Sequence, residues 1–377
     1  MYAIQDEFPQ HPEVRYLNHA AVAPWPRRAV QAINAFAAEN LLTGARDYPE
    51  WLLVEQRLRE RLVRLVNAPS SADIALVKNT SEALSFVAFG LDWKNGDQVV
   101  ISDEEFPSNR IVWEALKPVG VEVIQVSLKC DDPEGALLAA CGPRTRLLSI
   151  SSVQYASGLR LDLPRLGQGC RQRGVLFCVD AIQQLGALPF DAQACDCAFA
   201  MADGHKWLLG PEGLGVFYCR SDLREQLKLH EYGWHMIEHA GDYQRSDWQP
   251  ARTARRFECG SPNMLGAMAL EASLSLLEDV GMVEVGKALE TRVQWLLDGL
   301  SGIQGLTLLS PSEPTRRAGI VTFNLEGWDN AALFERLKTE QVICAPRGGG
   351  IRLSPHFYTE PRVIEETLVL LRQLAAG

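Results

Sequence analysis

The sequence feature that most constrains the fold is the alternation of short apolar runs with longer amphipathic stretches between about residues 73 and 220. Seven such runs read "DIALVKN", "DQVVISD", "VEVIQVS", "TRLLSISSVQ", "VLFCVDA", "CDCAFAMAD" and "LGVFYCR". Continuous apolar runs separated by helical patterns indicate βα repeats and a mainly parallel sheet covered on both faces. Only a short turn separates the last two runs, so we expect at least one antiparallel strand. The sequence therefore predicts an α/β fold around a mainly parallel seven-stranded sheet.

The length of 377 residues exceeds the size at which one core usually keeps growing, so we expect two domains. Residues 264–300 read as helix with one Val-Gly interruption, and "GIVTFNLEG", "QVICAPRG" and "IRLSPH" then supply strands around another helix. We predict a large α/β domain over residues 20–280. Residues 281–377, with an N-terminal arm over residues 1–19, should form a smaller α+β domain.

The net charge of −10, with no basic block to offset it, argues against nucleic acid or an anionic membrane as a partner. No apolar run has the length of a membrane span, and the N-terminus lacks the order of a signal peptide. We therefore expect a cytoplasmic protein. The nine cysteines are odd in number and lie mostly in strand-like runs, which favours reduced thiols.

No metal site is expected from the cysteines and histidines. Cys195 and Cys197 would face the same side of a strand, but no histidine lies near them. His235 and His239 in "HMIEH" would be i and i+4 on a helix, yet the glutamate is not in the zincin order.

Polar features follow several of the predicted strands, at the edge where ligands gather in open parallel sheets. In "VKNTSEALSF", Asn79 can cap a helix with Glu82 three positions on, as in a capping box. Thr80, Ser81 and the first free backbone amides of that helix would also suit a phosphate group. A plain helix cap explains the same pattern.

The other strand ends carry an acid, two amides and a lysine. Asp180 closes the apolar run "LFCVD" with Gln183 three residues later, and Gln154 ends "LLSISSVQ". Lys206 lies beside His205 in "DGHKW". A helix N-cap, a loop contact and a solvated lysine are the structural alternatives. Burying Asp180 is costly unless a cationic or protonated group meets it.

Together these features match the needs of pyridoxal phosphate (PLP). The cofactor requires an amine for its Schiff base, an acid that keeps the pyridine nitrogen protonated, and a cup for its phosphate. These three requirements are met by Lys206, by Asp180 and by the helix start at Thr80 and Ser81. A nicotinamide-binding enzyme is disfavoured because no G-x-G-x-x-G follows the early strands.

The chain resembles the class V aminotransferase family of fold type I PLP enzymes. That family includes cysteine desulfurases, selenocysteine lyase, cysteine C-S lyases and isopenicillin N epimerase. The resemblance runs over almost the whole chain, through the segments "YLNHAAVAP", "TSEAL", "VDAIQ", "DGHKW", "RFECGSPN" and "IRLSPHFY". It is specific for fold and cofactor and much less so for the reaction.

The resemblance implies a role for each matching residue. Lys206 would form the Schiff base and carry the proton at the substrate α-carbon, while Asp180 would pair with the pyridine nitrogen. Gln183 would hydrogen-bond the phenolic oxygen of the cofactor. Arg352 would clamp the substrate carboxylate, for which a planar guanidinium is suited, although a surface salt bridge is the alternative. Gln154 falls where relatives place an asparagine near substrate and cofactor.

The phosphate group would bind Thr80, Ser81 and His205. Ser261 in "GSPN" matches a hydroxyl that the family supplies to the phosphate from the partner subunit. This match implies a homodimer with a shared active site.

Three positions depart from the family pattern. Phe106 stands where desulfurases place a histidine over the cofactor ring, so it can stack there but cannot move protons. The loop that carries the nucleophilic cysteine of desulfurases is shortened to "RGGG", and Cys344, in a strand-like run, reads as a small core residue. Asp203 replaces a serine or threonine near the phosphate, and we expect it to point away or to act through its backbone.

These features favour β-elimination, as in a C-S lyase, on a cysteine-like amino acid bound as an external aldimine. Transamination and epimerisation need the same α-carbanion and remain alternatives, as does cysteine desulfurase activity. A noncatalytic binding module would have no use for Lys206, Asp180 and Arg352 together. The segment over residues 231–249 is rich in aromatic residues and would form a lid, a dimer contact or an ordinary surface loop.

Overall fold

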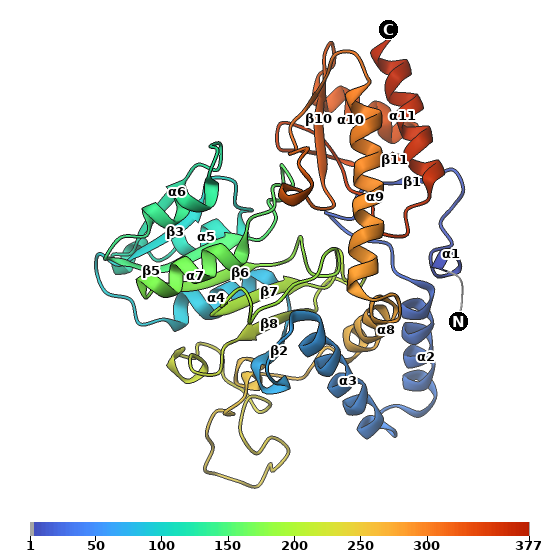
Figure 1. Cartoon of the computed structure of the whole chain (residues 1–377). Helices are drawn as coiled ribbons and strands as arrows, with labels where there is room; N and C mark the ends of the chain where they lie inside the picture. The colour runs from blue at the N-terminus through green and yellow to red at the C-terminus, as the bar shows by residue number, and fades with distance from the viewer. Residues whose placement is uncertain (1–3, 377) are drawn as a thin grey trace.

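The structure of the chain is a computed structural model that describes residues 4–376. The first three residues of the predicted arm and the last residue of the predicted small domain lie outside the described residues. A seven-stranded sheet forms the centre of the molecule, as the sequence predicts (Figure 1). Its strand order is β2-β8-β7-β6-β5-β3-β4. The strands are β2 (Ile74–Val77), β3 (Gln98–Ser102), β4 (Glu122–Val126), β5 (Thr145–Ser151), β6 (Leu176–Asp180), β7 (Phe199–Asp203) and β8 (Gly215–Cys219).

One strand of this sheet is reversed. β8 is antiparallel to both of its neighbours, β7 and β2, and the remaining pairs are parallel. Because β2 and β7 are each antiparallel to β8, they run in the same direction. The carboxyl ends of β2, β3, β5, β6 and β7 therefore meet at one edge, which is where the polar residues predicted to bind a ligand begin.

Helices cover both faces of the sheet, which explains why the strands are apolar throughout. One face packs against α4 (Thr80–Gly90) and α5 (Ser108–Glu114). The other packs against α3 (Tyr48–Val66), α6 (Pro133–Ala140), α7 (Leu163–Arg173) and α8 (Met264–Val280). Neighbouring residues of one strand alternate between the two cores, as Leu147 and Leu148 do.

A second, smaller body lies at the C-terminal end of the chain (Figure 1). Its antiparallel sheet has the order β12-β13-β10-β9. The strands are β9 (Leu306–Leu308), β10 (Val321–Leu325), β12 (Ala345–Arg347) and β13 (Gly350–Leu353), and the helices are α9 (Met282–Ser301), α10 (Asn330–Thr339) and α11 (Pro361–Ala375). A separate hydrophobic core holds these elements together. The sequence did not predict β9.

The N-terminal arm is tied to this smaller body. After α1 (Ile4–Glu7), β1 (Arg15–Tyr16) pairs in parallel with β11 (Val342–Ile343) before α2 (Arg27–Thr43) packs against α8. The predicted boundary at residue 281 coincides with Gly281, whose φ of 84° separates α8 from α9. The domain limits themselves stay a prediction.

Two local expectations were wrong. "QVICAPRG" is divided between β11 and β12, because Cys344 interrupts the pairing. β7 begins only at Phe199, because Cys195 and Cys197 lie in a turn where Asp196 has a φ of 51°. The segment around "HMIEH" is not helical, so His235 and His239 are not an i, i+4 pair on a helix.

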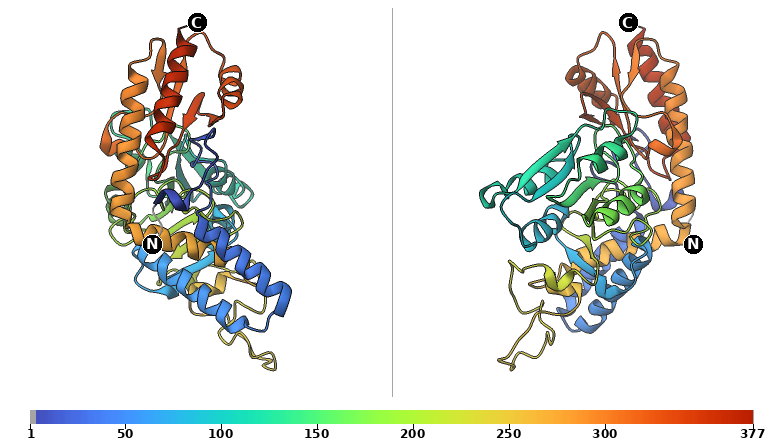
Figure 2. Two further views of the ribbon diagram at one scale, coloured as in Figure 1. Left: turned by 90° about the vertical axis from the view of Figure 1, so that its right-hand side faces the viewer. Right: turned by 60° about the vertical axis from the view of Figure 1, so that its left-hand side comes forward.

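Short 3₁₀ helices complete the described chain: η1 (Ser71–Asp73), η2 (Lys117–Val119), η3 (Arg224–Gln226), η4 (Ala254–Phe257) and η5 (Pro314–Arg316). The segment between η3 and η4 extends away from the body (Figure 2). It carries four exposed aromatic side chains, Tyr232, Trp234, Tyr243 and Trp248.

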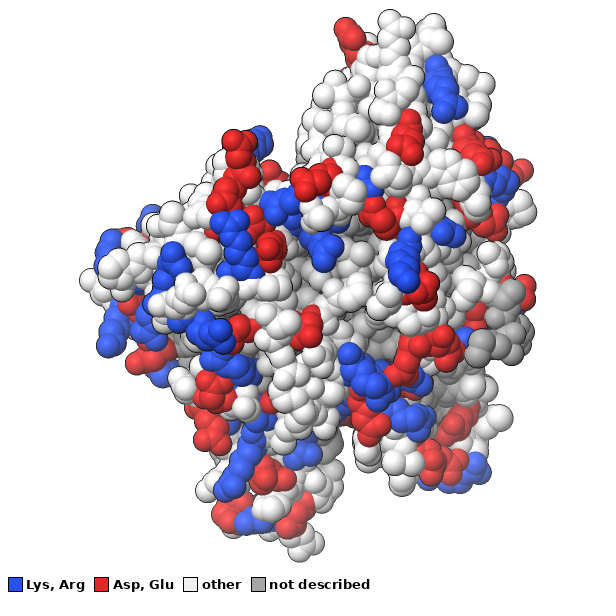
Figure 3. All heavy atoms as spheres, viewed as in Figure 1, with Lys and Arg blue, Asp and Glu red and all other residues white. Residues whose placement is uncertain are grey.

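The viewed surface carries acidic and basic side chains interspersed, without a continuous basic region (Figure 3). None of the helices within residues 4–376 has both the length and the apolar character needed to cross a bilayer. All nine cysteines are free thiols.

Substitution of Gly167 tests how closely α7 packs on the turn before β7. A Cβ at this position would overlap the carbonyl oxygen of Cys195. Gly167→Ala should lower the free energy of unfolding by about 3 kcal/mol, because overpacking against backbone outweighs the better helix propensity of alanine. Gly302→Ala is the control, since its Cβ would lie 3.8 Å from the nearest atom. Equal stability of the two variants in urea unfolding would contradict this packing.

Candidate active site

A cavity of about 270 Å³ lies at the edge of the large sheet where the strands of common direction end. It is closed on one side by residues of the smaller body. Eight of the ten residues that the sequence predicts for the site line this cavity: Thr80, Ser81, Phe106, Asp180, Gln183, His205, Lys206 and Arg352. Residues more than 270 positions apart in the chain therefore meet in one place.

Lys206 and Asp180 are the buried ionisable pair at the floor of the cavity. Asp180 is the last residue of β6, and Lys206 follows the end of β7 by three residues. Lys206 is 9% exposed and Asp180 is 2% exposed. Within residues 4–376, neither forms an ion pair with another side chain at contact distance. Lys206 is thus not the solvated loop lysine that its turn would otherwise suggest.

Burial shifts the pKa of both groups toward the neutral form. Desolvation lowers the pKa of Lys206, and the nearby Arg352 lowers it further, while the Asp180 carboxylate opposes this shift. Desolvation likewise raises the pKa of Asp180, against the backbone hydrogen bond from Ile182 and the charge of Lys206. An amine with a lowered pKa is a nucleophile near neutral pH.

The helix start at α4 has the predicted cap. Asn79 Oδ1 accepts a hydrogen bond from the Glu82 N–H at 2.9 Å, and Glu82 Oε2 accepts one from the Lys78 N–H at 2.6 Å. Thr80 is the first residue of the helix, and its buried Oγ1 has no hydrogen-bond partner. Ser81 Oγ donates to Ser108 Oγ at 2.8 Å. The cap and an anion site are compatible, because the cap leaves Thr80 Oγ1 and the first amides free.

Gln183 joins the cavity to the N-terminal segment. Its Nε2 donates to the Ala20 carbonyl at 3.1 Å, and its Oε1 accepts from Trp207 Nε1 at 2.8 Å. The second N–H of this amide is left for a ligand. The same contacts fix the position of the chain next to Lys206.

Arg352 comes from the smaller body, on a tight hairpin. β12 and β13 are joined by Gly348 and Gly349, with φ values of 62° and 76°. Such a two-residue turn requires positive φ at both positions, which glycine adopts readily. The "RGGG" segment is therefore a closed hairpin and not a loop that could carry a thiol to the site.

The Arg352 guanidinium is 2% exposed and only partly satisfied. Its Nη1 donates to the Tyr155 carbonyl at 2.7 Å, whereas its Nε has no partner. Burial and the charge of Arg347 lower the pKa of Arg352 to about 10. Arg352 is buried and has no ion pair with another described residue, so the surface salt bridge considered as an alternative is not formed. A bound carboxylate would pair with the free donor and offset the cost of burial.

Phe106 lies at the mouth of the cavity, 40% exposed. Lys206 Nζ is 5.6 Å from the centroid of its ring, and the Tyr155 ring meets it edge to face at 5.2 Å. The preceding residue, Glu105, is buried and accepts hydrogen bonds from Ser102 Oγ at 2.7 Å and Asn109 Nδ2 at 2.8 Å. Glu105 thereby fixes the turn that presents Phe106.

Two predicted residues do not line the cavity. Gln154 is fully buried, and its Nε2 donates to Glu105 Oε1 at 3.2 Å, which directs the amide into the protein. Ser261 is exposed and lines a separate cavity of about 290 Å³ beside Lys78. A residue that serves a partner subunit would lie outside its own cavity, so the predicted role of Ser261 stays a prediction.

Asp203 does not point away from the site, contrary to expectation. It is the last residue of β7, it is 7% exposed, and it lines the cavity. Its Oδ1 lies 3.0 Å from His205 Nδ1, although the angle is not that of a hydrogen bond. As the last residue of β7, Asp203 lies at the edge where the strands end, which places it beside the cavity.

Cys344 lies in the core of the smaller body and does not line the cavity. Burial raises the pKa of its thiol to about 12. The sequence interpretation of Cys344 as a core residue agrees with this position, because a thiol with such a pKa is a poor nucleophile.

Several cavity residues were not assigned a role from the sequence. They are Ala20, Ala21, Val22, Ser108, Tyr155, Ile182, Glu212 and Arg347. The segment "YLNHAAVAP" contained a signal, since it carries the resemblance at the N-terminus. For Tyr155 and Ser108 the only signal is their closeness in sequence to Gln154 and Phe106.

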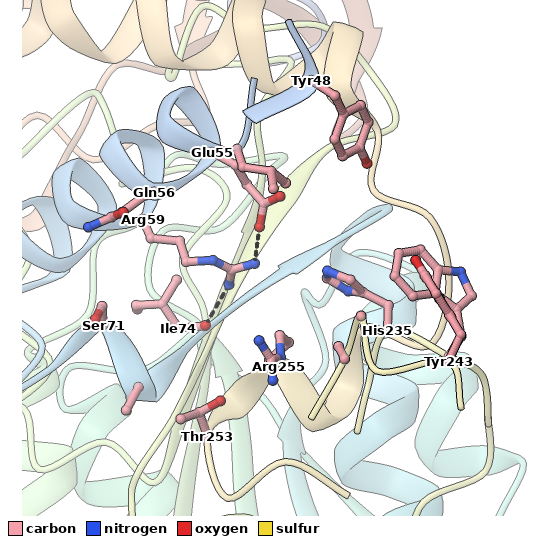
Figure 4. Close-up of a pocket in the computed structure, with 15 residues that line it drawn as sticks. Tyr48, Glu55, Gln56, Arg59, Ser71, Ile74, His235, Tyr243, Thr253 and Arg255 are labelled. Atoms are coloured by element: carbon pink, nitrogen blue, oxygen red, sulfur yellow. Dashed lines mark hydrogen bonds and ion pairs between the residues drawn. The ribbon is translucent and has the colours of Figure 1, made fainter. Parts of the chain in front are cut away.

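A larger cavity, of about 510 Å³, lies elsewhere, between α3 and the segment before η4 (Figure 4). Its central Arg59 is already satisfied, by Glu55, Glu258 and the Ile74 carbonyl. None of the ten predicted site residues lines it. Convergence of unpaired polar groups, and not volume, therefore identifies the candidate site. The described residues also contain no group of three or more potential metal ligands.

The polar atoms of the smaller cavity fit pyridoxal phosphate. Thr80 Oγ1, Asp203 Oδ1 and Arg352 Nε are buried without hydrogen-bond partners, and Lys206 and Asp180 face the same space. Buried polar atoms are normally hydrogen-bonded, so three unpartnered atoms around one cavity indicate a polar ligand. A buried amine, a buried acid and unpartnered donors in one cavity are the groups that a phosphorylated aldehyde cofactor requires.

Comparison with known proteins gives the family. The family model of Aminotransferase class-V matches residues 15–352. A probable cysteine desulfurase of Methanothermobacter thermautotrophicus is 31% identical, with 94% of this chain and 93% of the relative covered. A cysteine desulfurase of Salmonella dublin is 31% identical over 82% of this chain and 77% of the relative. The chain belongs to the class-V aminotransferase family, and it is a PLP-dependent enzyme.

Solved structures share the fold over the whole chain. The complex of the cystine C-S lyase C-DES with its reaction product cysteine persulfide has a TM-score of 0.89 and 25% identity, with 97% of this chain and 99% of that chain covered. The apo cysteine desulfurase from Thermococcus onnurineus NA1 has a TM-score of 0.88 and 23% identity, with 100% and 99% covered. These neighbours confirm the predicted α/β fold.

The electrostatic coupling in the cavity predicts how Lys206 titrates. In the cofactor-free protein, Lys206 should react with an amine-specific aldehyde reagent at lower pH than the exposed Lys129, because burial lowers the pKa of Lys206. Asp180→Asn should lower the midpoint further, since the carboxylate raises this pKa, and Arg352→Gln should raise it. Peptide mapping by mass spectrometry after reductive labelling gives the three midpoints. The same midpoint in all three proteins would contradict this coupling.

Proposed function

We propose that the enzyme cleaves the C-S bond of cysteine or a cysteine-like amino acid by β-elimination. The observation that carries the proposal is the meeting of Lys206, Asp180 and Arg352 in one cavity whose approach, the Arg347–Gly350 hairpin, holds no thiol. Two kinds of similar protein support a cysteine-like substrate. One is the probable cysteine desulfurase at 31% identity, and the other is the cystine C-S lyase C-DES.

The large-domain residues would hold the cofactor. We assign the Lys206 amine to its carbonyl carbon, Asp180 to its ring nitrogen and Gln183 to its phenolic oxygen. Thr80, Ser81 and His205 would hold the phosphate. Bound PLP supplies a ring that accepts the electron pair of the substrate α-carbon. Asp180 serves this purpose because an unpaired buried carboxylate favours a protonated partner.

Substrate orientation is assigned to Arg352. Its free Nε and its remaining donors would bind the α-carboxylate, which places the Cα–H bond toward Lys206. Lys206 would then take the α-proton as a general base, for which a lowered pKa is favourable. The sulfur on the β-carbon would leave as the α-carbon releases its electron pair. Phe106 would cover the ring by stacking and would take no part in proton transfer.

The absence of a thiol from the hairpin argues against sulfur transfer to a protein cysteine. Cys344, the nearest candidate, is buried and has a raised pKa. Transamination and epimerisation would begin with the same proton removal by Lys206, so the cavity residues do not separate them from elimination. The three reactions differ in their products, which therefore distinguish them.

We also propose a homodimer with a shared active site, in which Ser261 reaches the phosphate of the partner subunit. Ser261 is exposed and lies outside its own cavity, which is compatible with this role. The net charge of −10 and the free cysteines support a cytoplasmic location and disfavour nucleic-acid or membrane partners.

The reaction class can be tested with a panel of amino acids. Purified protein should be yellow, and cysteine or cystine should give pyruvate together with sulfide or persulfide. Lys206→Ala should lose the visible band of the lysine-bound cofactor and at least about 10³-fold in turnover, because the amine is both anchor and base. Keto-acid exchange or optical inversion without pyruvate would overturn elimination. A protein that takes up no PLP would overturn the whole assignment.

A separate variant tests the thiol. Cys344→Ser should retain turnover within about twofold, because the residue lies in the core of the smaller body and not at the cavity. Cys259→Ser is the matched control, since this partly exposed cysteine also lies outside the cavity. Loss of sulfide release in Cys344→Ser, with normal folding by circular dichroism, would establish a persulfide mechanism instead.

A further inference from the structure

Glu105 is a buried carboxylate, 6% exposed, that does not itself line the cavity. It precedes Phe106 in the turn after β3, and within this turn it accepts the hydrogen bonds from Ser102 and Asn109. Burying a carboxylate is costly unless donors surround it, so these bonds offset part of that cost. The same two oxygens also reach a second segment of the chain.

The second segment is the turn after β5. Ser151 Oγ donates to Glu105 Oε2 at 2.6 Å, and the Ser151 N–H lies 3.0 Å from both carboxylate oxygens. Gln154 Nε2 donates to Glu105 Oε1 at 3.2 Å. Hydrogen bonds to an ionised group are stronger than neutral ones. One side chain therefore joins two turns whose residues are 46 to 49 positions apart in the sequence.

Each of the two turns carries a residue that lines the cavity. The turn after β3 carries Phe106, and the turn after β5 carries Tyr155. The Tyr155 carbonyl accepts the hydrogen bond from Arg352 Nη1 at 2.7 Å. The rings of Tyr155 and Phe106 meet edge to face, with 5.2 Å between their centroids. A shift of one turn against the other would therefore move Phe106 relative to Arg352.

We propose that Glu105 is a positioning residue for the substrate: by bonding to both turns, its carboxylate fixes the place of Phe106 relative to Arg352. This inference rests on the proposed function, which assigns Phe106 to the cofactor ring and Arg352 to the substrate carboxylate. Glu105 contacts neither the cavity nor the reacting atoms. It acts through the Phe106 turn on one side and through the Tyr155 carbonyl on the other.

Two substitutions separate the reach of Glu105 from its charge. Glu105→Asp keeps the charge and shortens the side chain by one methylene group, so the carboxylate no longer reaches donors on both turns. Glu105→Gln keeps the length and removes the charge. The charge is a competing explanation, because burial raises the pKa of Asp180 and the charge of Glu105 raises it further. A positioning role predicts the larger loss in Glu105→Asp, whereas an electrostatic role predicts it in Glu105→Gln.

The surroundings of Glu105 can accept an amide at this position. Asn109 Oδ1 accepts from Ser149 Oγ at 2.6 Å and from Trp113 Nε1 at 3.0 Å, so Asn109 Nδ2 must donate to an oxygen of residue 105. On the other side, Gln154 Oε1 is buried without a partner. When the Gln154 amide turns over, this oxygen can accept from the new N–H group of Glu105→Gln. The bonds between the two turns are then kept.

The experiment measures the Kd of L-alanine for the PLP-loaded enzyme by calorimetry. L-Alanine has the α-carboxylate that Arg352 would bind and no leaving group on its β-carbon, so its Kd reports carboxylate binding whichever reaction the enzyme catalyses. Glu105→Asp should raise this Kd at least about tenfold, because a misplacement of about 1 Å can cost about 10²-fold. Glu105→Gln should recover this loss to within about threefold of the wild type.

Glu134→Asp is the matched control. It shortens another buried carboxylate, which accepts a hydrogen bond from Arg316 Nη1 at 2.6 Å and does not line the cavity. The Kd of L-alanine should stay within about twofold of the wild type in this variant. Shortening a buried carboxylate then has no general effect on the site.

Two further readouts separate positioning from a general loss of stability. Added to Arg352→Gln, Glu105→Asp should raise the Kd of L-alanine less than about twofold, because the group that it positions is already gone. The visible circular dichroism of the bound cofactor reports its contact with Phe106, and it should change in Glu105→Asp and be kept in Glu105→Gln. If Glu105→Asp does not fold, Ser151→Ala removes the 2.6 Å bond alone and should raise the Kd about threefold.

The outcomes distinguish this inference from the proposed function. An unchanged Kd in Glu105→Asp, full additivity with Arg352→Gln, or a larger loss in Glu105→Gln than in Glu105→Asp would overturn the inference. The last of these results would assign the effect to the charge of Glu105. Failure of the wild-type enzyme to bind PLP would overturn the proposed function, and binding of L-alanine without pyruvate formation from cysteine or cystine would overturn only the proposed reaction.

Discussion

The structure depends on the burial of unpaired charges at one edge of a sheet. Lys206, Asp180 and Arg352 are each at most 9% exposed, and Lys206 and Asp180 lack a contact ion pair among the described residues. Uncompensated burial of this kind is unfavourable, so the surrounding fold must stabilise it. The two hydrophobic cores on the faces of the large sheet provide that stability. A ligand that pairs with these groups offsets the free-energy cost of burying them, and for this reason they indicate a binding site.

Two bodies must meet to complete the cavity. The large sheet supplies the amine and the acid, whereas the smaller body supplies Arg352 on a hairpin that bonds to the Tyr155 carbonyl. The N-terminal segment lies between them: the Ala23 N–H donates to the His205 carbonyl at 2.8 Å, and the His19 N–H donates to the Ser354 carbonyl at 3.2 Å. These backbone hydrogen bonds connect the turn that carries Lys206 with the smaller body that carries Arg352.

The departures from the family pattern all concern protons and nucleophiles. Phe106 replaces a proton-transferring ring, the hairpin removes a thiol, and Asp203 adds an acid near the proposed phosphate position. The first two remove groups that could act on protons or sulfur, which leaves Lys206 as the proposed base. The third places a carboxylate oxygen 3.0 Å from His205 Nδ1.

The sequence by itself predicted the sheet, the cofactor and eight residues that line the candidate cavity. Short apolar runs between helical patterns favour buried strands, and the residues that follow them, such as Asp180 and the start of α4, are local in sequence. The sequence did not reveal that Asp203 faces the cavity, that Gln154 turns toward Glu105, or that Tyr155 and Arg347 line the site. These outcomes depend on which way a side chain leaves its strand and on which distant segment packs against it. Only the tertiary structure decides that, because the contacts involved span two separately packed bodies.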